Sequence, residues 1–334
     1  MEILRSKPIN SERLKRDLDK SSSVLSAAEF SRGIKKGDVL ACCPICSGSE
    51  SKNIVDVYGF LYRECIGCGS AFVSNPPNEN DLMSAYRSDY YTSANKVLLA
   101  NDSIIDYRVK QIAEPKVRFV VDRLTTTKRT WLDVGCGVGE ILSAAKTLGF
   151  ETLGLEANPM EGEYAKKRFG IEVREEYVSA STLHRYVGRY GVVSLFSVLE
   201  HVLSPNTILS DVAKIQEKGD NLVIEVPHYP SLSVLSQITF PEHINRMMHP
   251  PLHLFLFPMK ALELMLKKQG YEIRAAWFFG QDIYEMFSTL GLFVKDLNGS
   301  ALHQGLAPLM NDLQGVVDNH DLSDEILLIA EKVV

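Results

Sequence analysis

Three glycines at alternate positions follow a short apolar strand near the middle of the chain. The segment reads Thr-Trp-Leu-Asp-Val-Gly-Cys-Gly-Val-Gly-Glu-Ile-Leu over residues 130–142, and a helix-forming run follows at once. Glycine lets the backbone approach a ligand closely, and the start of a helix presents unpaired N–H groups to an anion. A dinucleotide-binding turn would need its third glycine at position 140, where this chain has Glu140. The residues that this pattern singles out are Asp133, Gly135, Gly137 and Gly139.

Four of the six cysteines form two pairs with C-x-x-C spacing, and 18 residues separate the pairs. Two such turns can each present two thiolates to one tetrahedral zinc ion. A redox-active pair is the alternative, and the adjacent Cys42 could replace Cys43 in the first turn. The predicted zinc ligands are Cys43, Cys46, Cys65 and Cys68.

From residue 130 onward the sequence predicts strands that alternate with helices. This alternation would place the glycine turn at the end of a strand. Glycines at 149, 170 and 270 follow three expected helices, where a left-handed cap residue belongs. Alternation of this kind indicates an α/β sheet covered by helices on both faces. The expected strands are 130–134, 151–155, 171–174, 191–196, 221–226, 271–278 and 325–332.

The chain divides into four parts by composition. Residues 1–38 are polar and expected to be helical, and residues 39–75 form the zinc segment with short strands near 54–57 and 61–63. A linker rich in turn residues and then helices occupy 76–126. Residues 127–334 form the main domain, in which the apolar helical patches of 280–322 are expected to be an inserted cap or a dimer face.

The composition limits the class of protein. With 334 residues, 45% of them apolar and 23% charged, the chain can build a large globular domain and a smaller one. No apolar run reaches the roughly 18 residues that a membrane-spanning helix needs, and the charged N-terminus does not fit a signal peptide. We therefore expect a cytoplasmic location without a membrane partner. The net charge of −6 argues against a nucleic-acid partner, because phosphate binding favours a basic surface.

An acidic residue followed by G-x-G-x-G resembles motif I of the class I S-adenosylmethionine-dependent methyltransferases. Further segments agree with that family in order along the chain. They are Leu153-Gly-Leu-Glu156, Val198-Leu-Glu-His-Val202, Asn221-Leu-Val-Ile-Glu-Val-Pro227 and His253-Leu-Phe-Leu-Phe-Pro258. The resemblance implies a seven-stranded Rossmann-like sheet and S-adenosylmethionine as the methyl donor.

The resemblance also implies roles for individual residues. The glycine turn would receive the carboxylate of the methionine part, with Asp133 near its ammonium group, and Glu156 would accept the ribose hydroxyls. Phe196 and Ser197 would form a floor under the methionine part. Tyr91 could close over the cofactor from the linker side, although plain packing is an equal alternative.

The N-terminal segment resembles the zinc ribbon fused to methyltransferases of sugar and surface-polysaccharide pathways, including the deoxysugar C-methyltransferases. That resemblance implies a small-molecule substrate such as an activated or nucleotide-linked sugar. A zinc-ribbon ribosomal RNA methyltransferase is the alternative. The sugar enzymes carry Tyr-His-Glu-His before the apolar run, whereas this chain has His249-Pro-Pro-Leu-His253, in which only the last histidine is kept.

Methyl transfer to an oxygen, nitrogen or carbon atom also calls for a general base, and histidine is the first choice near neutral pH. Five histidines lie between residues 201 and 253, and His253 is preferred because the family places a base there. His243 is the second choice, since the adjacent Glu242 could orient it or raise its pKa. His201 is expected to have a structural or cofactor-supporting role.

Overall fold

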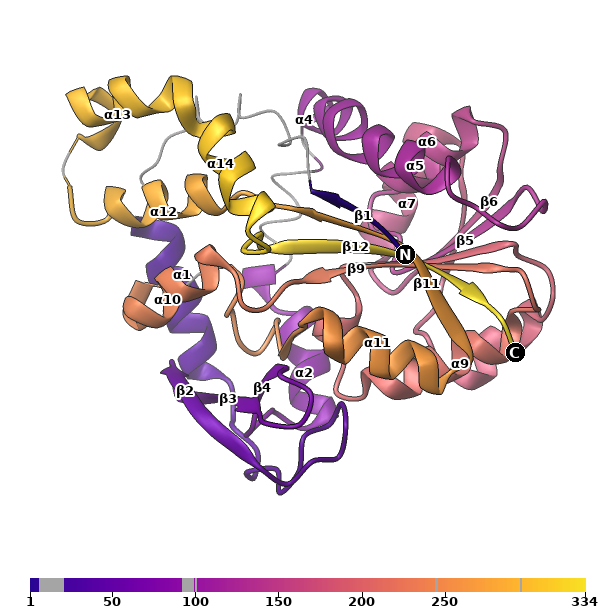
Figure 1. Cartoon of the computed structure of the whole chain (residues 1–334), viewed down its shortest axis with the longest axis horizontal. Coiled ribbons are helices and arrows are strands. Elements are labelled where there is room, and N and C mark those ends of the chain that lie inside the picture. The colour runs from indigo at the N-terminus through magenta and orange to yellow at the C-terminus, as the bar shows by residue number, and fades with distance from the viewer. Residues whose placement is uncertain (6–20, 92–98, 100, 244–245, 295) are drawn as a thin grey trace.

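A computed structural model of the chain (Figure 1) describes residues 1–5, 21–91, 99, 101–243, 246–294 and 296–334. An eight-stranded sheet forms the core, and a four-stranded sheet forms a second, smaller unit. From one edge to the other, the large sheet consists of β1 (Glu2–Arg5), β11 (Tyr271–Phe279), β12 (Glu325–Lys332), β9 (Asn221–Pro227), β8 (Val192–Phe196), β5 (Thr130–Val134), β6 (Glu151–Glu156) and β7 (Glu172–Glu175).

The central strands are buried on both faces. All seven residues of β9 and the first four of β8 are buried, as expected for strands that read as continuous apolar runs. β12 runs antiparallel to β9 and β11, and every other neighbouring pair in the large sheet is parallel. The predicted α/β, Rossmann-like class is therefore confirmed, with a strand present at each of the seven expected places.

The predicted count of seven strands is wrong by one. β1 adds an eighth strand parallel to β11, with Glu2 opposite Ala275 and Arg5 opposite Phe278. Residues 1–38 were predicted to be helical, but the described helix there is α1 (Ser21–Gly33), and residues 6–20 lie outside the described residues. Four residues show too little periodicity for the sequence to distinguish a strand from a helical turn. The conformation of β1 is determined by its pairing with the edge of β11.

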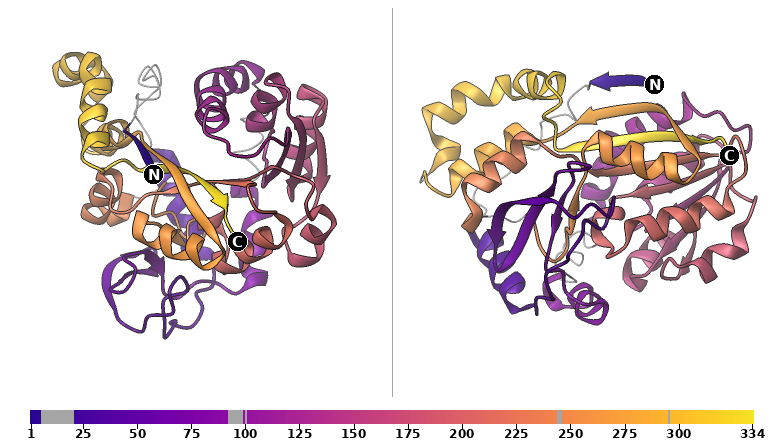
Figure 2. Two further views of the ribbon diagram at one scale, coloured as in Figure 1. Left: turned by 45° about the vertical axis from the view of Figure 1, so that its right-hand side comes forward. Right: turned by 60° about the horizontal axis from the view of Figure 1, so that its bottom comes forward.

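Helices cover both faces of the large sheet (Figure 2). α5, α6 and α7 pack with the cluster around Trp131 and Ile329 on one face, while α9 and α11 pack around Leu132 and Ile224 on the other. The first group, with the helical turns that precede it, is α4 (Asp102–Arg108), η2 (Val109–Ala113), α5 (Glu114–Val121), α6 (Glu140–Thr147) and α7 (Pro159–Phe169). The second is α8 (Ala180–Leu183), η3 (His184–Tyr186), α9 (Pro205–Ile215) and α11 (Met259–Lys268).

The small sheet joins the N-terminal segment to the main domain. Its order is β10 (Phe255–Leu256), β4 (Ala71–Val73), β3 (Phe60–Cys65) and β2 (Ser51–Val57), and all pairs are antiparallel. We call residues 39–75 the ribbon, as in the prediction. Because β10 lies far along the chain, the ribbon completes its sheet with a strand of the main domain. α2 (Glu79–Tyr86) follows the ribbon and is capped by the side chain of Asn78.

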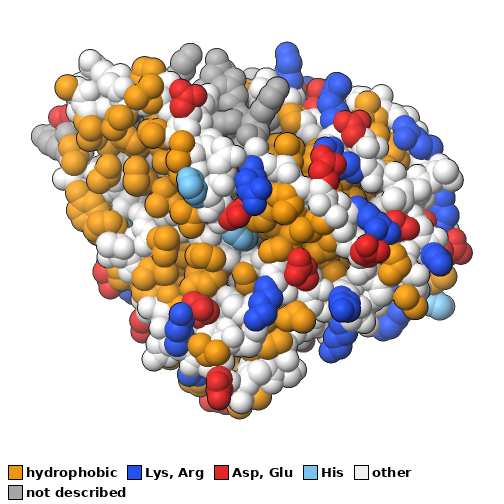
Figure 3. Space-filling model, viewed as in Figure 1, with side chains coloured by type: hydrophobic (Ala, Val, Ile, Leu, Met, Phe, Trp, Pro, Cys, Tyr) orange, Lys and Arg blue, Asp and Glu red, His pale blue; other side chains and the backbone are white. Residues whose placement is uncertain are grey.

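Residues 280–322 contain α12 (Asp282–Gly291), η6 (Leu297–Gly299), α13 (Ala301–Leu306), η7 (Ala307–Leu309) and α14 (Met310–Asn319). With α10 (Leu232–Thr239) they form an apolar area on one face of the molecule (Figure 3). Phe293, Leu302 and Val316 are each at least half exposed there. The expected homodimer through this segment stays a prediction. In the described part of the chain, no helix has the length and apolarity needed to cross a membrane.

Candidate functional site

The glycine turn connects β5 to α6 with a left-handed backbone at all three glycines. The φ angle is 75° at Gly135, 51° at Gly137 and 82° at Gly139, and α6 begins at the next residue. A Cβ atom on residue 135 would lie 2.8 Å from Cγ2 of Val198, so a side chain there would collide with the segment after β8. Within the turn, the N–H groups of Gly135 and Gly139 are donated to the Leu155 and Cys136 carbonyls, so the N–H groups that an anion could reach are those of the first turn of α6.

Glu156 ends β6 and contacts the same turn. Its Oε2 accepts the Gly137 N–H at 2.8 Å, and its Oε1 accepts the Asn158 N–H at 2.7 Å. Each carboxylate oxygen has a second lone pair, so Glu156 can still accept two hydroxyl hydrogens. Burial raises the pKa of this carboxyl group, whereas the backbone N–H groups of Asn158 and Gly137 act against that rise.

Asp133 lies below the turn in β5 and is almost completely buried. Its Oδ1 accepts the Ser194 hydroxyl at 2.6 Å, and Ser194 in turn accepts the Trp131 indole N–H at 2.8 Å. Burial raises the pKa of Asp133 to about 7. A nearby ammonium group would favour its ionised form, which fits the role implied for this residue.

The other cofactor candidates lie around the same edge of the sheet. Phe196 ends β8, and Ser197 follows with a φ angle of 53° and donates its N–H to the Glu225 carbonyl at 3.0 Å. Tyr91 lies in the helical turn after α2 and packs edge-to-face on Tyr86, with ring centroids 5.1 Å apart. The His201 ring also contacts Tyr86, with ring centroids 6.0 Å apart.

Replacing Glu156 with Gln should weaken S-adenosylmethionine binding by about 10- to 100-fold, because hydrogen bonds to a charged acceptor are lost. Isothermal titration calorimetry measures this change. Glu175→Gln is the matched control, since Glu175 lies opposite Glu156 in β7 and is exposed. Equal dissociation constants for wild type and Glu156→Gln would remove Glu156 from the cofactor site.

Three titratable side chains converge beside the segment that follows β8. Glu200 and His201 belong to η4 (Leu199–His201), two residues beyond Val198, and His253 comes from the segment before β10. One ligand atom from each of the three lies within 4.8 Å of the other two. His201 Nε2 is 3.7 Å from Glu200 Oε1, and the rings of His201 and His253 are 4.8 Å apart.

Backbone carbonyls determine which nitrogen of each imidazole is free. His201 Nδ1 lies 2.7 Å from the Leu252 carbonyl, and His253 Nδ1 lies 2.9 Å from the Met247 carbonyl. A carbonyl only accepts, so both Nδ1 atoms carry the hydrogen and both Nε2 atoms present a lone pair. Among the described residues, the buried Glu200 Oε2 has no hydrogen-bond partner. Within this described part of the chain, the cluster thus offers two imidazole lone pairs and one buried carboxyl oxygen without a partner.

Burial keeps this cluster uncharged near neutral pH. It raises the pKa of Glu200 to about 8 and lowers the pKa of His201 to about 4. Burial also lowers the pKa of His253 well below its ordinary value, and the neighbouring His201 and His249 lower it further. A neutral imidazole of this kind can take a proton from a ligand hydroxyl. The Nε2 atoms of His201 and His253, together with an ionised Glu200, could also hold a divalent cation.

Aromatic side chains surround the cluster. The Tyr86 hydroxyl lies 2.9 Å from His201 Nδ1, and the Tyr90 hydroxyl lies 3.3 Å from His249 Nε2. Tyr90 is stacked on Phe30 of α1, with ring centroids 4.3 Å apart. Burial lowers the pKa of His249 to about 4, so it too is neutral. Tyr86, Tyr90 and His249 therefore give the cluster aromatic neighbours without charge.

The second candidate pair lies elsewhere. Glu242 and His243 belong to η5 (Pro241–His243), which has no buried residue. Glu242 forms an exposed ion pair with Arg32 at 3.0 Å, and the His243 ring packs on Phe293 at 4.9 Å. The structure therefore places this pair on the surface beside α1 and the 280–322 segment, and brings neither residue to His253.

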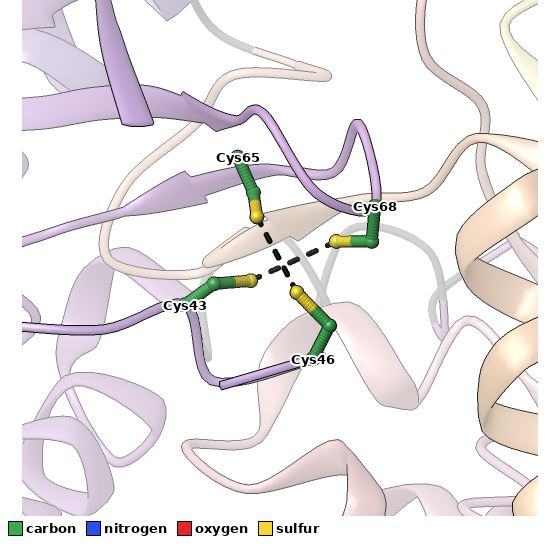
Figure 4. A group of neighbouring side chains, drawn as sticks. All are labelled: Cys43, Cys46, Cys65 and Cys68. Atoms are coloured by element: carbon green, nitrogen blue, oxygen red, sulfur yellow. Dashed lines mark hydrogen bonds between the residues drawn. The ribbon is translucent and has the colours of Figure 1, made fainter. Parts of the chain in front are cut away.

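The four predicted zinc ligands converge at one end of the ribbon (Figure 4). Sγ of Cys43 and Sγ of Cys68 are 3.8 Å apart, and Sγ of Cys46 and Sγ of Cys65 are 3.4 Å apart. Four thiolates at about 2.3 Å from one zinc ion would be about 3.8 Å from each other, so the group fits this metal. Cys42 is exposed and lies outside the group.

Sequence reasoning alone did not identify Glu200, Tyr62 or Tyr86 as neighbours of His253. His201 was expected to have a structural or cofactor-supporting role, and its ring contacts the preferred base. The order of Glu200 and His201 within the V-L-E-H-V segment was the available signal. Their contact with a residue about fifty positions later arises from the tertiary fold.

Comparison with known proteins identifies the family of the main domain. A family described as a methyltransferase domain matches residues 105–276. The chain is similar to the mitochondrial ubiquinone biosynthesis O-methyltransferase of Schizosaccharomyces pombe, with 31% identity over 149 residues, which are 42% of this chain and 54% of that protein. It is 30% identical over 122 residues to the ubiquinone biosynthesis O-methyltransferase of Erwinia tasmaniensis, covering 35% and 49% of the two chains.

The chain thus spans about half the length of these two curated relatives. Among solved structures, it is similar to the magnesium protoporphyrin IX methyltransferase of Synechocystis PCC 6803. The TM-score is 0.49 and the identity 14%, over 76% of this chain and all of the other.

Proposed function

This chain belongs to the methyltransferase-domain family, and from that premise we propose that it methylates a hydroxyl oxygen of a small acceptor. It is an S-adenosylmethionine-dependent methyltransferase, and the acceptor atom is the part that we propose. The observation that supports oxygen is the cluster of Glu200, His201 and His253, which offers two imidazole lone pairs and a buried carboxyl oxygen that has no partner among the described residues. A hydroxyl group would donate its hydrogen to one of the free imidazole nitrogens.

The residues have simple tasks in this proposal. S-adenosylmethionine supplies an electrophilic methyl group, so the chain must align the acceptor oxygen, exclude water and accept one proton. Alignment of reactants can contribute about 7–11 kcal/mol to lowering a barrier. His253 Nε2 accepts the proton, while the Met247 carbonyl holds the opposite side of its ring.

The surroundings of the cluster favour an acceptor with an aromatic ring. Tyr86, Tyr90 and His249 present aromatic rings from two segments, and the histidines there are neutral near pH 7. The two relatives named above are O-methyltransferases of ubiquinone biosynthesis by name, which agrees with a hydroxylated ring. We therefore propose a phenolic or catecholic acceptor.

A nucleotide-linked sugar is the second candidate, supported by the order of the cysteine pairs and the V-L-E-H-V segment. A diphosphate needs cationic partners. Arg246, whose charge acts on His253, already contacts Asp324 at 2.7 Å and Glu285 at 3.4 Å. Because Arg246 is already paired with two carboxylates, it is not available to a diphosphate, which favours the phenolic acceptor over the nucleotide sugar.

We also propose that Cys43, Cys46, Cys65 and Cys68 bind one zinc ion. The convergence of the four sulfur atoms supports this proposal, and the exposed position of Cys42 argues that Cys43 is the ligand.

Incubation of the protein with methyl-labelled S-adenosylmethionine tests the proposed function. The acceptors should include catechols with and without an isoprenoid chain, together with a panel of nucleotide sugars. Label is expected on a catechol oxygen. Transfer only to a sugar would establish the second candidate, and the absence of transfer to any acceptor or cell extract would contradict both.

The pH dependence of the reaction should show an unusually low acid limit. Burial lowers the pKa of His253, so this base loses its lone pair only well below pH 6.5. Therefore kcat/KM for a catechol should stay constant as the pH falls from 7 to about 6 and should decrease only at lower pH. An acid limb at pH 6.5 or above would show that the base is a histidine exposed to solvent.

A further inference from the structure

The ribbon contacts the backbone of the preferred base directly. Tyr62 in β3 is 1% exposed, and its hydroxyl donates to the His253 carbonyl at 2.6 Å. Burial raises the pKa of Tyr62 well above its ordinary value, so the hydroxyl remains a donor throughout the working range of pH. A buried donor of this kind constrains the peptide that it holds.

Leu254, which follows His253, forms backbone hydrogen bonds with both η4 and the ribbon. The Leu254 N–H donates to the Glu200 carbonyl at 2.7 Å, and the Leu254 carbonyl accepts the Val73 N–H at 2.9 Å. The pairing continues into β10, where Phe255 lies opposite Phe72 and Leu256 opposite Ala71. The segment that carries His253 is thus fixed between η4 and the ribbon strand β4.

The cysteine group closes the hairpin from which these contacts come. Cys65 ends β3, and its N–H donates to the Ser70 carbonyl at 2.9 Å, while the Gly69 N–H donates to the Cys65 carbonyl at 2.8 Å. Within the hairpin, Tyr62 lies opposite Val73. The two ribbon residues that hold the His253 segment therefore share one rung of a hairpin that ends in two of the four cysteines.

We propose that Tyr62 is a positioning residue, and that the ribbon hairpin completes the catalytic site by fixing His253 against Glu200 and His201. This inference rests on the proposed role of His253 as the base. The ribbon thereby has a task in methyl transfer without contacting the acceptor. Binding of S-adenosylmethionine should not depend on it, because the glycine turn and Glu156 belong to β5, α6 and β6.

Tyr62→Phe removes one oxygen and keeps the buried ring, so it tests the inference in the full chain. We expect a decrease in kcat of about tenfold, since a buried hydrogen bond that orients the base is lost. The dissociation constant of S-adenosylmethionine and the metal content should not change. The imidazole resonance of His253, assigned by its loss in His253→Gln, should shift in histidine-labelled protein.

Tyr58→Phe is the matched control. Tyr58 is a ribbon tyrosine whose hydroxyl donates to the Glu242 carbonyl at 3.3 Å, away from the base. This variant should keep both the rate and the His253 resonance. Unchanged kcat and an unchanged His253 resonance in Tyr62→Phe would overturn the proposal.

A second measurement applies even where Tyr62→Phe does not fold. Gradual removal of metal from the wild-type protein with a chelator should shift the His253 resonance while S-adenosylmethionine still binds. A resonance that stays fixed as the metal leaves would contradict the inference. The resonance needs no acceptor, so failure of the proposed function and failure of this inference can be distinguished.

Discussion

Replacing His253 with Ala should reduce the rate of methyl transfer by about 10²–10⁴, the usual contribution of a general base. His253 Nε2 is a free imidazole nitrogen beside Glu200 and His201, and alanine removes this proton acceptor. Single-turnover transfer from labelled S-adenosylmethionine, measured at saturating cofactor, reports this step. Because the side chain is largely enclosed, thermal unfolding should be followed as well, and His253→Gln provides a variant with a smaller change in volume.

His243→Ala tests the alternative base. His243 packs on Phe293 outside the cluster, so its removal should leave the transfer rate close to that of the wild type. A near-native rate in His253→Ala, together with a large loss in His243→Ala, would transfer the catalytic role to the surface pair. The dissociation constant of the cofactor should be the same in both variants.

Cys65→Ser should abolish metal binding and unfold the ribbon. Structural zinc sites contribute about 10–16 kcal/mol of apparent binding free energy to folding, far more than a sheet of four short strands can replace. Because the ribbon holds the His253 segment, methyl transfer should be lost as well. Metal analysis, cobalt substitution spectra and hydrogen exchange of the Val73 and Leu254 amides measure these effects.

Cys42→Ser is the control for the metal site. Cys42 is exposed and adjacent to Cys43, and its replacement should leave one zinc ion per chain. Loss of zinc from Cys42→Ser would show that the first pair is Cys42 and Cys46. Wild-type protein with a folded ribbon and no metal would contradict the zinc proposal.

Local patterns were sufficient for much of the main domain. The apolar run of β5, the three glycines and the helix after them appear in the structure where the sequence predicts them, because each is determined by neighbouring residues. Periodicity likewise located the antiparallel β12 at residues 325–332 as predicted. The C-x-x-C spacing predicted that Cys43 and Cys68 would be near one another.

Contacts between distant segments could not be predicted in this way. The pairing of β4 with β10 joins residues about 180 positions apart, and β10 has only two residues. The residues of β1 were predicted to be helical. They form a strand because they pair with the edge of β11, which lies far away in the sequence. Glu242 was predicted to assist a base because it is adjacent to His243. The structure places both residues in η5, which has no buried residue.

The sequence by itself determined the α/β class, the glycine turn at Gly135, Gly137 and Gly139, and the grouping of the four cysteines, because short-range spacing controls these features. Only the tertiary structure decided which histidine meets Glu200, and that Tyr62 of the ribbon holds the peptide of His253. The physical reason is that a proton-accepting cluster depends on distances of a few ångströms between side chains from separate segments. Those distances are set by the packing of β10 between η4 and β4, which no single stretch of the chain encodes.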